Sequence, residues 1–265
     1  MNKILGALVV VVVLVACTTT PPAVDLKRAK ECRDGGSSSC PDDPYYRIVE
    51  HDPFPLMPSL VGGMKKGSLY IKLSVFEKRT PIDFDDAIKK APAGSPLIID
   101  LRDNPGGYLV AATAILTRFA KSEETLLFTI RDSNDTLHPR RVSDVIEEVR
   151  RVYPTLKHTI GDLADRKVVL IVNERSASAS ETLAGVMQEW GYYVIGTKTV
   201  GKGVAQRMYD KENGRILIRT VFELLIGEER RPIHQVGILP SCVLPWWRHR
   251  VASYANVLMQ SNKCP

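Results

Sequence analysis

The stretch KVVLIVNERSASASETLAGVMQEWG, residues 167–191, decides the fold class of this chain. Apolar residues run almost unbroken over 167–172 and predict a buried strand, and apolar positions three and four apart over 180–190 predict a helix. Between them stands Ser176-Ala177-Ser178-Ala179-Ser180, three serines that alternate with alanine. A buried strand that leads directly into a helix is the repeating unit of α/β proteins.

The same alternation of short apolar strands and helices extends on both sides of this stretch. Strands are predicted at 68–76, 96–100, 125–130 and 192–196, helices at 83–91, 107–121 and 143–153, and a long strand or hairpin at 215–227. The chain is 44% hydrophobic and 25% charged, as expected for a globular protein rather than a disordered one. The pattern predicts an α/β fold with a largely parallel sheet and flanking helices.

The N-terminus predicts export and lipid attachment. One lysine precedes the weakly polar run 4–16, which is too short to span a bilayer and has the size of a signal-peptide core. Its end, Leu14-Val15-Ala16-Cys17, resembles the lipobox of bacterial lipoproteins, in which the cysteine carries the lipid. A plain signal peptide cut after Ala16 is the alternative. The expected location is the cell envelope, facing the periplasm, and Thr18 in place of an aspartate favours the outer membrane over the inner.

Four cysteines remain after Cys17, namely Cys32, Cys40, Cys242 and Cys264. An even number in an oxidising compartment predicts two disulfides. Three pairings are open, and the pairs Cys32–Cys40 and Cys242–Cys264 are favoured because each closes a short loop. The sequence has no CxxC or His-x-x-x-His pair, so no metal site is predicted.

The formal net charge of +6 raises the question of an anionic partner. The basic residues of the chain are scattered along the sequence. At 140–151, for example, arginines lie among acidic residues. A nucleic-acid module would show a clustered basic face with aromatic side chains, so no nucleic-acid partner is expected. The positive surface suits anionic lipid headgroups or envelope polymers.

The composition divides the chain into four parts. These are a lipoprotein signal peptide at 1–16, a polar tether at 17–45, a Pro-rich N-terminal extension of indefinite structure at 46–66, and the α/β domain at 67–265.

Three segments could carry chemistry. Asp100-Leu101-Arg102-Asp103-Asn104-Pro105-Gly106-Gly107 follows a buried strand, and its glycines would let backbone amides approach a ligand, although a plain tight turn explains it equally. Ser178 stands at a helix N-terminus, where unpaired amides can stabilise an oxyanion. Its spacing to Glu181 is also that of a capping box, but capping accounts for only one of the three serines.

The third segment is Gly201-Lys202-Gly203, with Gln206 four residues on. A lysine buried between glycines would have a lowered pKa and could act as a base. The same region satisfies GxxxxGK, but Gly203 replaces the magnesium-binding Ser/Thr of a phosphate loop. None of the five histidines has a triad context, and His234 is predicted on the surface or in a turn.

Together these segments resemble the serine–lysine C-terminal processing peptidases, also called tail-specific proteases. The similarity covers residues 67–244 and includes LIIDLRDNPGG (97–107), NERSASASETLAGVMQEWG (173–191), GTKTVGKGVAQ (196–206) and VGILP (236–240), in the order of that family. It implies a crotonase/ClpP-like α/β fold and a peptidase that needs no cofactor. Ser178 matches the nucleophile, Lys202 the general base and Gln206 the residue that orients the lysine. The backbone amides of Ala179, Gly106 and Gly107 match the oxyanion hole, and Glu189 matches a supporting acid.

The sequence departs from the family in two respects. Residues 18–66 are too short for the peptide-binding PDZ domain that members commonly carry, and the spacing from Ser178 to Lys202 is about one residue shorter than the family pattern. Access of a protein or peptide substrate would then be controlled by an adaptor or activating partner, or by residues 46–66. The leading hypothesis is an envelope-anchored serine endopeptidase that works through an acyl-enzyme. The alternatives are a non-catalytic binding lipoprotein on the same fold and a crotonase-type acyl hydrolase.

Overall fold

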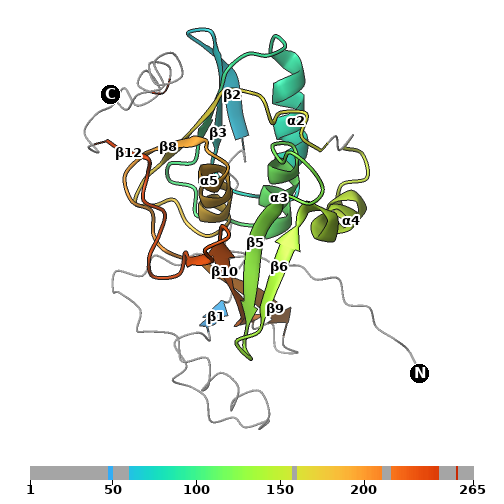
Figure 1. Ribbon diagram of the computed structural model, residues 1–265, viewed down its shortest axis with the longest axis vertical. Helices are drawn as coiled ribbons and strands as arrows, with labels where there is room; N and C mark the ends of the chain where they lie inside the picture. The colour runs from blue at the N-terminus through green and yellow to red at the C-terminus, as the bar shows by residue number, and fades with distance from the viewer. Residues whose placement is uncertain (1–46, 50–59, 157–159, 211–215, 245–254, 256–265) are drawn as a thin grey trace.

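The computed structural model describes residues 47–49, 60–156, 160–210, 216–244 and 255. These residues form two six-stranded sheets and the helices that pack against them (Figure 1). The signal peptide, the tether, Cys17, Cys32, Cys40 and Cys264 lie outside the described residues, so the predictions made for them stay predictions.

One sheet is largely parallel and supports the candidate site. Its strand order is β12-β8-β7-β4-β3-β2, and all neighbours are parallel except β2 and β3. Its strands are β2 (Leu60–Lys65), β3 (Ser68–Leu73), β4 (Leu97–Asp100), β7 (Val168–Val172), β8 (Tyr193–Gly196) and β12 (Cys242–Val243).

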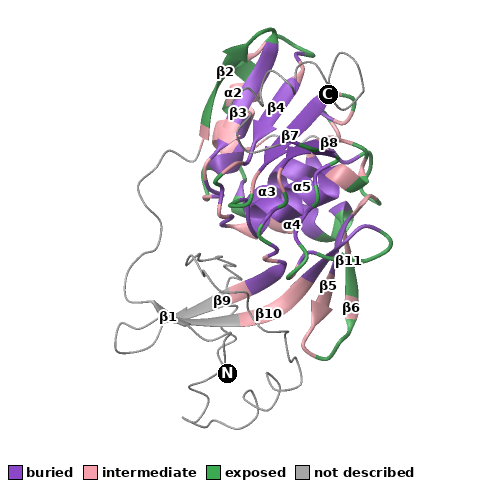
Figure 2. Cartoon of the chain, turned by 90° about the vertical axis from the view of Figure 1, so that its left-hand side faces the viewer, coloured by how far each residue is buried: buried purple, intermediate pink, exposed green. Residues whose placement is uncertain are grey.

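Both faces of the central strands β4 and β7 are buried, as is usual for parallel sheets, whereas the edge strand β2 is exposed. Leu97 and Ile99 of β4 belong to the main hydrophobic cluster, whereas Ile98 between them belongs to a second cluster with Cys242. The alternation follows from the two-residue period of a strand. Four helices contribute side chains to the main cluster (Figure 2), namely α2 (Thr80–Lys90), α3 (Leu109–Thr117), α4 (Val142–Val152) and α5 (Ala179–Glu189).

The other sheet is antiparallel and is organised around its longest strand, β10 (Ile216–Ile226). This strand pairs directly with four others. The remaining strands are β1 (Arg47–Val49), β5 (Leu126–Asp132), β6 (Leu137–Arg141), β9 (Val204–Asp210) and β11 (Arg231–Pro232), and α4 (Val142–Val152) follows β6. In Figure 1 this sheet lies below the parallel one, with α5 near the centre.

The predicted fold class is confirmed, because the model is an α/β arrangement with a largely parallel sheet and flanking helices. The second sheet differs from the expectation, since its pairings are all antiparallel. Residues 46–66, to which the sequence assigned no definite structure, contribute β1 to one sheet and β2 to the other. Strand pairing with β10 and β3 gives these short segments their conformation.

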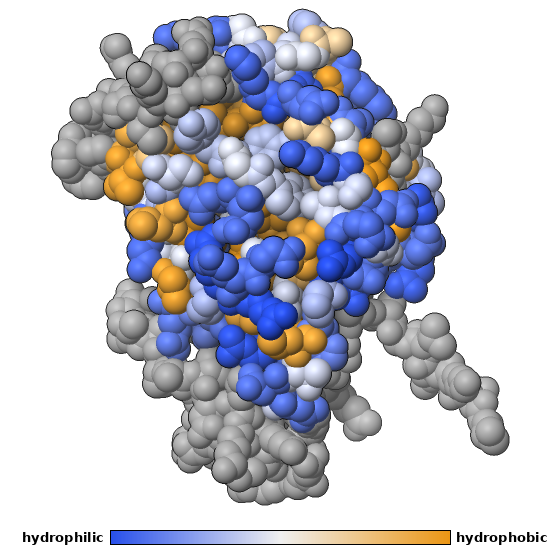
Figure 3. Space-filling model, viewed as in Figure 1, coloured by the Kyte–Doolittle hydropathy of each residue, from blue (hydrophilic) through white to orange (hydrophobic). Residues whose placement is uncertain are grey.

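The surface seen in Figure 3 is mostly hydrophilic, with apolar residues in separate groups. Four of the large hydrophobic residues exposed in the described part of the chain lie in the loop that contains Lys202 or in the segment after β11. They are Val200, Val236, Leu239 and Val243. Among the described residues, no helix has the length and apolar character to cross a membrane.

Candidate active site

Three loops at one edge of the parallel sheet hold the candidate residues. The β4–α3 loop contains Gly106 and Gly107. The β7–α5 loop contains Ser178 and is named the nucleophile loop after the role predicted from the sequence, and the β8–β9 loop contains Lys202 and is named the base loop in the same way. Since β4, β7 and β8 are parallel neighbours, their carboxyl ends lie side by side. Ligands of open α/β sheets bind at this edge.

Ser178 is the N-cap residue of α5 and has an unusual backbone conformation, with φ 57° and ψ −117°. A non-glycine residue rarely adopts a positive φ, and such conformations cluster at functional sites. Ser178 is 4% exposed, and its amide donates to Glu181 Oε2 at 2.8 Å. A strained strand-to-helix turn of this kind presents a serine hydroxyl at the positive end of a helix.

The two outer serines of the SASAS segment have a different task from Ser178. Ser176 Oγ donates to the carbonyl of Leu101 at 2.8 Å, and Ser180 Oγ donates to the carbonyl of Asn104 at 3.0 Å. Both serines are fully buried. They attach the nucleophile loop to the β4–α3 loop, which explains the three alternating serines better than capping does.

Two backbone amides are available as oxyanion donors. The amides of Ala179 and Gly107 make no hydrogen bond within the described part of the chain. The expectation for Gly106 is corrected, because its amide donates to Asn104 Oδ1 at 2.8 Å and is therefore engaged. Asn104 is itself buried, and its Nδ2 donates to the carbonyl of Leu73 at 3.1 Å, which fixes the turn.

Gly106 nevertheless has to be glycine. Its φ is +102°, and an added Cβ would lie 2.8 Å from both Ser178 Cβ and the carbonyl oxygen of Ala177. Neither contact is tolerated without movement of the nucleophile loop. The turn therefore touches Ser178 only because residue 106 has no side chain.

Glu181 joins the nucleophile loop to the base loop. Its Oε2 accepts the amides of Ser178 at 2.8 Å and Lys202 at 2.7 Å. Its Oε1 accepts the amide of Gly201 at 2.6 Å and the hydroxyl of Thr199 at 2.5 Å. Burial raises the pKa of the fully buried Glu181, and these four hydrogen bonds counteract part of the rise.

His234, predicted on the surface or in a turn, packs beside the base loop. It does lie in a turn, but both of its ring nitrogens are buried without a hydrogen-bond partner. A Cβ on Gly203 would approach its amide nitrogen to 2.3 Å, and the next amide, that of Gln235, donates to the carbonyl of Gly201 at 2.8 Å. Burial, and after it the charge of Lys202, lowers the pKa of His234.

The two remaining candidates, Gln206 and Glu189, lie on different elements of the structure. Gln206 lies on β9, four residues after Lys202 and opposite Thr220 of β10, on the strand that leaves the base loop. Glu189 is the last residue of the 11-residue helix α5 and forms an ion pair with Arg231. At about 1.5 Å per residue it stands roughly 16 Å from Ser178. The geometry gives Glu189 no direct part in the site.

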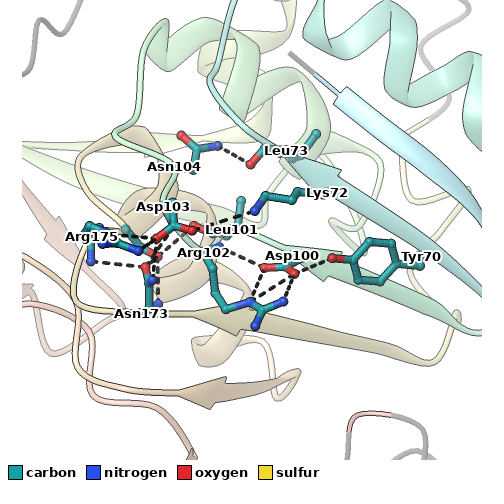
Figure 4. Close-up of polar contacts among 11 residues, drawn as sticks. Tyr70, Lys72, Leu73, Asp100, Leu101, Arg102, Asp103, Asn104, Asn173 and Arg175 are labelled. Carbon is teal, nitrogen blue, oxygen red and sulfur yellow. Dashed lines mark hydrogen bonds and ion pairs between the residues drawn. The ribbon is translucent and has the colours of Figure 1, made fainter. Parts of the chain in front are cut away.

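The charged residues before the glycine turn form a supporting network (Figure 4). Asp100, at the end of β4, is fully buried and accepts two hydrogen bonds from Arg102 Nε, at 2.9 and 3.1 Å, and one from Tyr70 Oη at 2.5 Å. Burial, and then the Asp100 carboxylate, raises the pKa of Tyr70. Asp100 and Arg102 therefore brace the loop rather than face a substrate.

Asp103 ties the same loop to the nucleophile loop. Its amide donates to Asn173 Oδ1 at 2.9 Å, and its carboxylate accepts from Asn173 Nδ2 at 2.8 Å and Arg175 Nε at 2.7 Å (Figure 4). Burial opposes ionisation of Asp103, but the hydrogen bonds from Asn173 and Arg175 outweigh it and lower its pKa.

Three residues of the site were not identified from the sequence as parts of it. The spacing of Glu181 to Ser178 indicated only a helix cap, because its contacts with the base loop depend on tertiary structure. Asn104 was interpreted as a turn initiator, and His234 gave no signal at all. The described residues contain no cluster of three or more His, Cys, Asp or Glu side chains that could hold a metal ion.

The chain is similar to curated proteases over its structured core. It is 32% identical over 180 residues to the carboxy-terminal processing protease CtpB of Bacillus subtilis, which covers 66% of this chain and 33% of that protein. It is 30% identical over 174 residues to the chloroplastic carboxyl-terminal-processing peptidase 3 of Arabidopsis thaliana, covering 64% and 30% of the two chains. The chain thus matches only about a third of the length of these relatives.

Solved structures share the fold. The photosystem II D1 C-terminal processing protease superposes with a TM-score of 0.54 at 20% identity, over 73% of this chain and 50% of that one. A lipoprotein from Streptococcus agalactiae superposes with a TM-score of 0.57 at 16% identity, over 76% and 70%. The model of peptidase family S41 matches residues 67–244. The chain therefore belongs to peptidase family S41, a family of serine-type peptidases.

Proposed function

We propose that this chain is an endopeptidase in which Ser178 is the nucleophile, Lys202 the general base and Gln206 the residue that orients Lys202. The observation that carries the proposal is the shared Glu181 oxygen: the backbone amides of Ser178 and Lys202 both lie within 3 Å of Oε2. A nucleophile and a base held on adjoining loops, with free amides beside them, are the parts that acyl transfer requires.

Each step of the reaction uses groups of this chain. The neutral amine of Lys202 accepts the Ser178 hydroxyl proton as Oγ attacks the peptide carbonyl. The oxyanion that develops is stabilised by the amides of Ala179 and Gly107. The Lys202 ammonium then protonates the departing amine as the C–N bond breaks. In the second half, Lys202 deprotonates a water that hydrolyses the Ser178 ester and restores the enzyme.

The backbone at Ser178 supports this assignment. It has a positive φ of 57°, and the amide of Ala179, the next residue, makes no hydrogen bond within the described residues. The N-terminal end of the helix carries a partial positive charge, which favours the alkoxide and the oxyanion. Lys202 lies between Gly201 and Gly203, both buried, so its loop packs closely against the rest of the site.

The substrate class we propose is an unfolded or extended polypeptide. The curated relatives are named for processing carboxyl termini, and we propose that an adaptor or activating partner presents such ends to this chain. The exposed apolar residues Val200 and Val236 adjoin the base loop and would suit apolar substrate side chains.

A degradation assay tests the proposed chemistry. The purified protein is incubated with an unfolded protein substrate, and release of peptides is followed for wild type, Ser178→Ala and Lys202→Ala. General acid–base groups and nucleophiles contribute roughly 100- to 10,000-fold, so both variants should lose at least about 100-fold. Glu189→Gln serves as the control and should stay within about threefold of wild type, since it lies at the far end of α5.

A result in which Ser178→Ala retains the wild-type rate overturns the proposed nucleophile. If the wild type is inactive and a serine-reactive probe does not label Ser178, a non-catalytic binding lipoprotein on the same fold takes its place.

We also propose that Cys17 carries a lipid that anchors the mature protein in the bacterial envelope, facing the periplasm. Two acyl chains bind a membrane far more firmly than one. In a bacterial host, the wild type should incorporate labelled palmitate and partition into the detergent phase. Cys17→Ser should do neither, and incorporation of palmitate by Cys17→Ser would refute the anchor.

A further inference from the structure

One fully buried acidic side chain, Glu181, has contacts that the proposed mechanism does not use. In a capping box, the glutamate reaches back to the amide of the N-cap residue only. Here three of its four hydrogen bonds come from the base loop, from Thr199, Gly201 and Lys202. Capping of α5 therefore accounts for only the contact with Ser178.

We propose that Glu181 is a positioning residue that fixes the base loop against the nucleophile and thereby sets the Ser178–Lys202 geometry. The proposal rests on the proposed peptidase function, and the experiment below separates the two. Glu181 acts through the backbone of Ser178 and Lys202, so it is not itself a catalytic residue.

The hydrogen-bond pattern requires a carboxylate of this length. Each oxygen of Glu181 accepts at least one backbone N–H, at 2.6 Å for Oε1 and 2.7 and 2.8 Å for Oε2. A glutamine would direct its NH₂ group at a backbone N–H in either orientation. An aspartate is one methylene shorter and could not reach both loops. An uncharged isostere therefore cannot reproduce the link.

The link continues to a third segment. Thr199 Oγ1 donates to Glu181 Oε1 at 2.5 Å and accepts the amide of Ile238 at 2.7 Å. The turn that ends at Ile238 contains His234, which packs against Gly203. Both sides of the base loop are thus held, one by Glu181 and the other by this turn. Preorganisation of this kind is what lets a base act without prior rearrangement.

A second acidic contact joins the same two loops and provides a matched control. Glu174 Oε2 accepts a hydrogen bond from the hydroxyl of Thr197 at 2.8 Å. Glu174 belongs to the β7–α5 loop and Thr197 to the β8–β9 loop. Glu174 is exposed and, among the described residues, contacts the base loop through this one hydrogen bond, whereas Glu181 is buried and accepts three from that loop. Loss of Glu174 tests whether any link between the loops would suffice.

The experiment is a double-mutant cycle read with a serine-reactive fluorophosphonate probe on the full chain. Labelling rates of Ser178 are measured for wild type, Glu181→Gln, Lys202→Ala and the double variant. A misplacement of about 1 Å can cost about 100-fold, so Glu181→Gln should lose roughly that factor in the wild-type background. In the Lys202→Ala background, Glu181→Gln should lower the labelling rate by less than about threefold, because there is no longer a lysine whose position relative to Ser178 Glu181 could fix.

Equal losses in the two backgrounds would overturn the proposal, since general damage to the fold is additive. A decrease of the labelling rate in Glu181→Gln that is no larger than the decrease in Glu174→Gln would also overturn the proposal. If the wild type is not labelled, or if Lys202→Ala labels as fast as wild type, the proposed function fails instead. Hydrogen exchange then still tests the positioning role: the amides of Gly201 and Lys202 should exchange at least about tenfold faster in Glu181→Gln, and unchanged exchange refutes it.

Folding of Glu181→Gln is checked by circular dichroism and thermal unfolding. If this variant does not fold, Thr199→Val replaces it, because valine removes one of the four donors and keeps the shape. We expect about fivefold slower labelling in Thr199→Val and recovery in Thr199→Ser, which keeps the hydroxyl. Labelling of Thr199→Val at the wild-type rate would contradict the proposal.

Discussion

At the residue scale, the site depends on the missing side chain of Gly106. We predict that Gly106→Ala lowers kcat/KM by at least about 100-fold, because the methyl group would push the nucleophile loop out of place. Gly94→Ala is the matched control, since Gly94 also has a positive φ, +72°, but has nothing within 4 Å of an added Cβ. Both variants should lose about 1 kcal/mol of stability from backbone strain. Peptidase assays and thermal unfolding of the two variants decide the matter, and equal activities would contradict the prediction.

The buried imidazole of His234 predicts a dependence of stability on pH. Its pKa in the folded protein is lowered, chiefly by burial, so below pH 6.5 the unfolded chain binds the proton more readily than the folded one. The stability that the neutral His234 imidazole contributes is fully present above about pH 6.5, and it is lost as the pH falls through the pKa of His234 in the folded protein. The fall in Tm from pH 8 to pH 5 should therefore be smaller in His234→Gln than in wild type. Parallel Tm curves would show that His234 does not titrate in this way.

At the scale of elements, the sequence predicted most strands and helices because each repeats a simple apolar period. The strand at 167–172 and the helix at 180–190 correspond to β7 and α5 within a residue or two. The antiparallel pairing was not predictable in this way, because an alternating segment such as 215–227 does not reveal which strands will flank it. β10 pairs with segments far apart in the chain, among them β1 and β5.

The same limit applies to the site. Ser178 and Lys202 were predicted from local motifs and a family resemblance, and the β7–α5 and β8–β9 loops bring their backbones together. The roles of Glu181 and Asn104 depend on hydrogen bonds across three loops, which no local spacing encodes. The distance of Glu189 from Ser178 is likewise set by the fold, because the rise along α5 carries Glu189 away from Ser178.

The β7–α5 loop makes a prediction about its three serines. Ser176→Ala and Ser180→Ala should each destabilise the protein by about 1–2 kcal/mol, because each removes a buried hydrogen bond to the β4–α3 loop. Ser178→Ala should change stability by less than about 0.5 kcal/mol while abolishing activity. Urea unfolding of the three variants, compared with their peptidase rates, tests this division. A destabilisation of Ser178→Ala as large as that of Ser180→Ala would contradict it.

At the scale of the whole molecule, the site lies where the two sheets meet. The parallel sheet supplies the loops after β4, β7 and β8, while β9 leaves the base loop and pairs with β10 of the antiparallel sheet. Lys202 is therefore held from both sheets, and Gln206 lies on the antiparallel side. A change in how the sheets pack would move the base relative to the nucleophile.

The end of the parallel sheet carries the last prediction, that Cys242 and Cys264 form a disulfide in the exported protein. Cys242 begins the edge strand β12 and is buried in the second hydrophobic cluster with Leu244. A disulfide that closes a loop of about 20 residues reduces the conformational entropy of the unfolded chain and so stabilises the folded protein by about 3 kcal/mol. For a chain of this size, the double variant Cys242→Ser/Cys264→Ser should lower Tm by about 6–12 °C.

Thiol counting in the unfolded, unreduced protein gives the direct test, with no free thiol expected from Cys242 or Cys264. The variant Cys32→Ser/Cys40→Ser is the matched control, and we expect a smaller fall in Tm, because those residues close a shorter loop. Since β12 pairs with β8, which leads into the base loop, loss of the Cys242–Cys264 bond should also reduce peptidase activity at temperatures below Tm. Two free thiols in the wild type, or a Tm unchanged in the Cys242→Ser/Cys264→Ser variant, would refute the pairing.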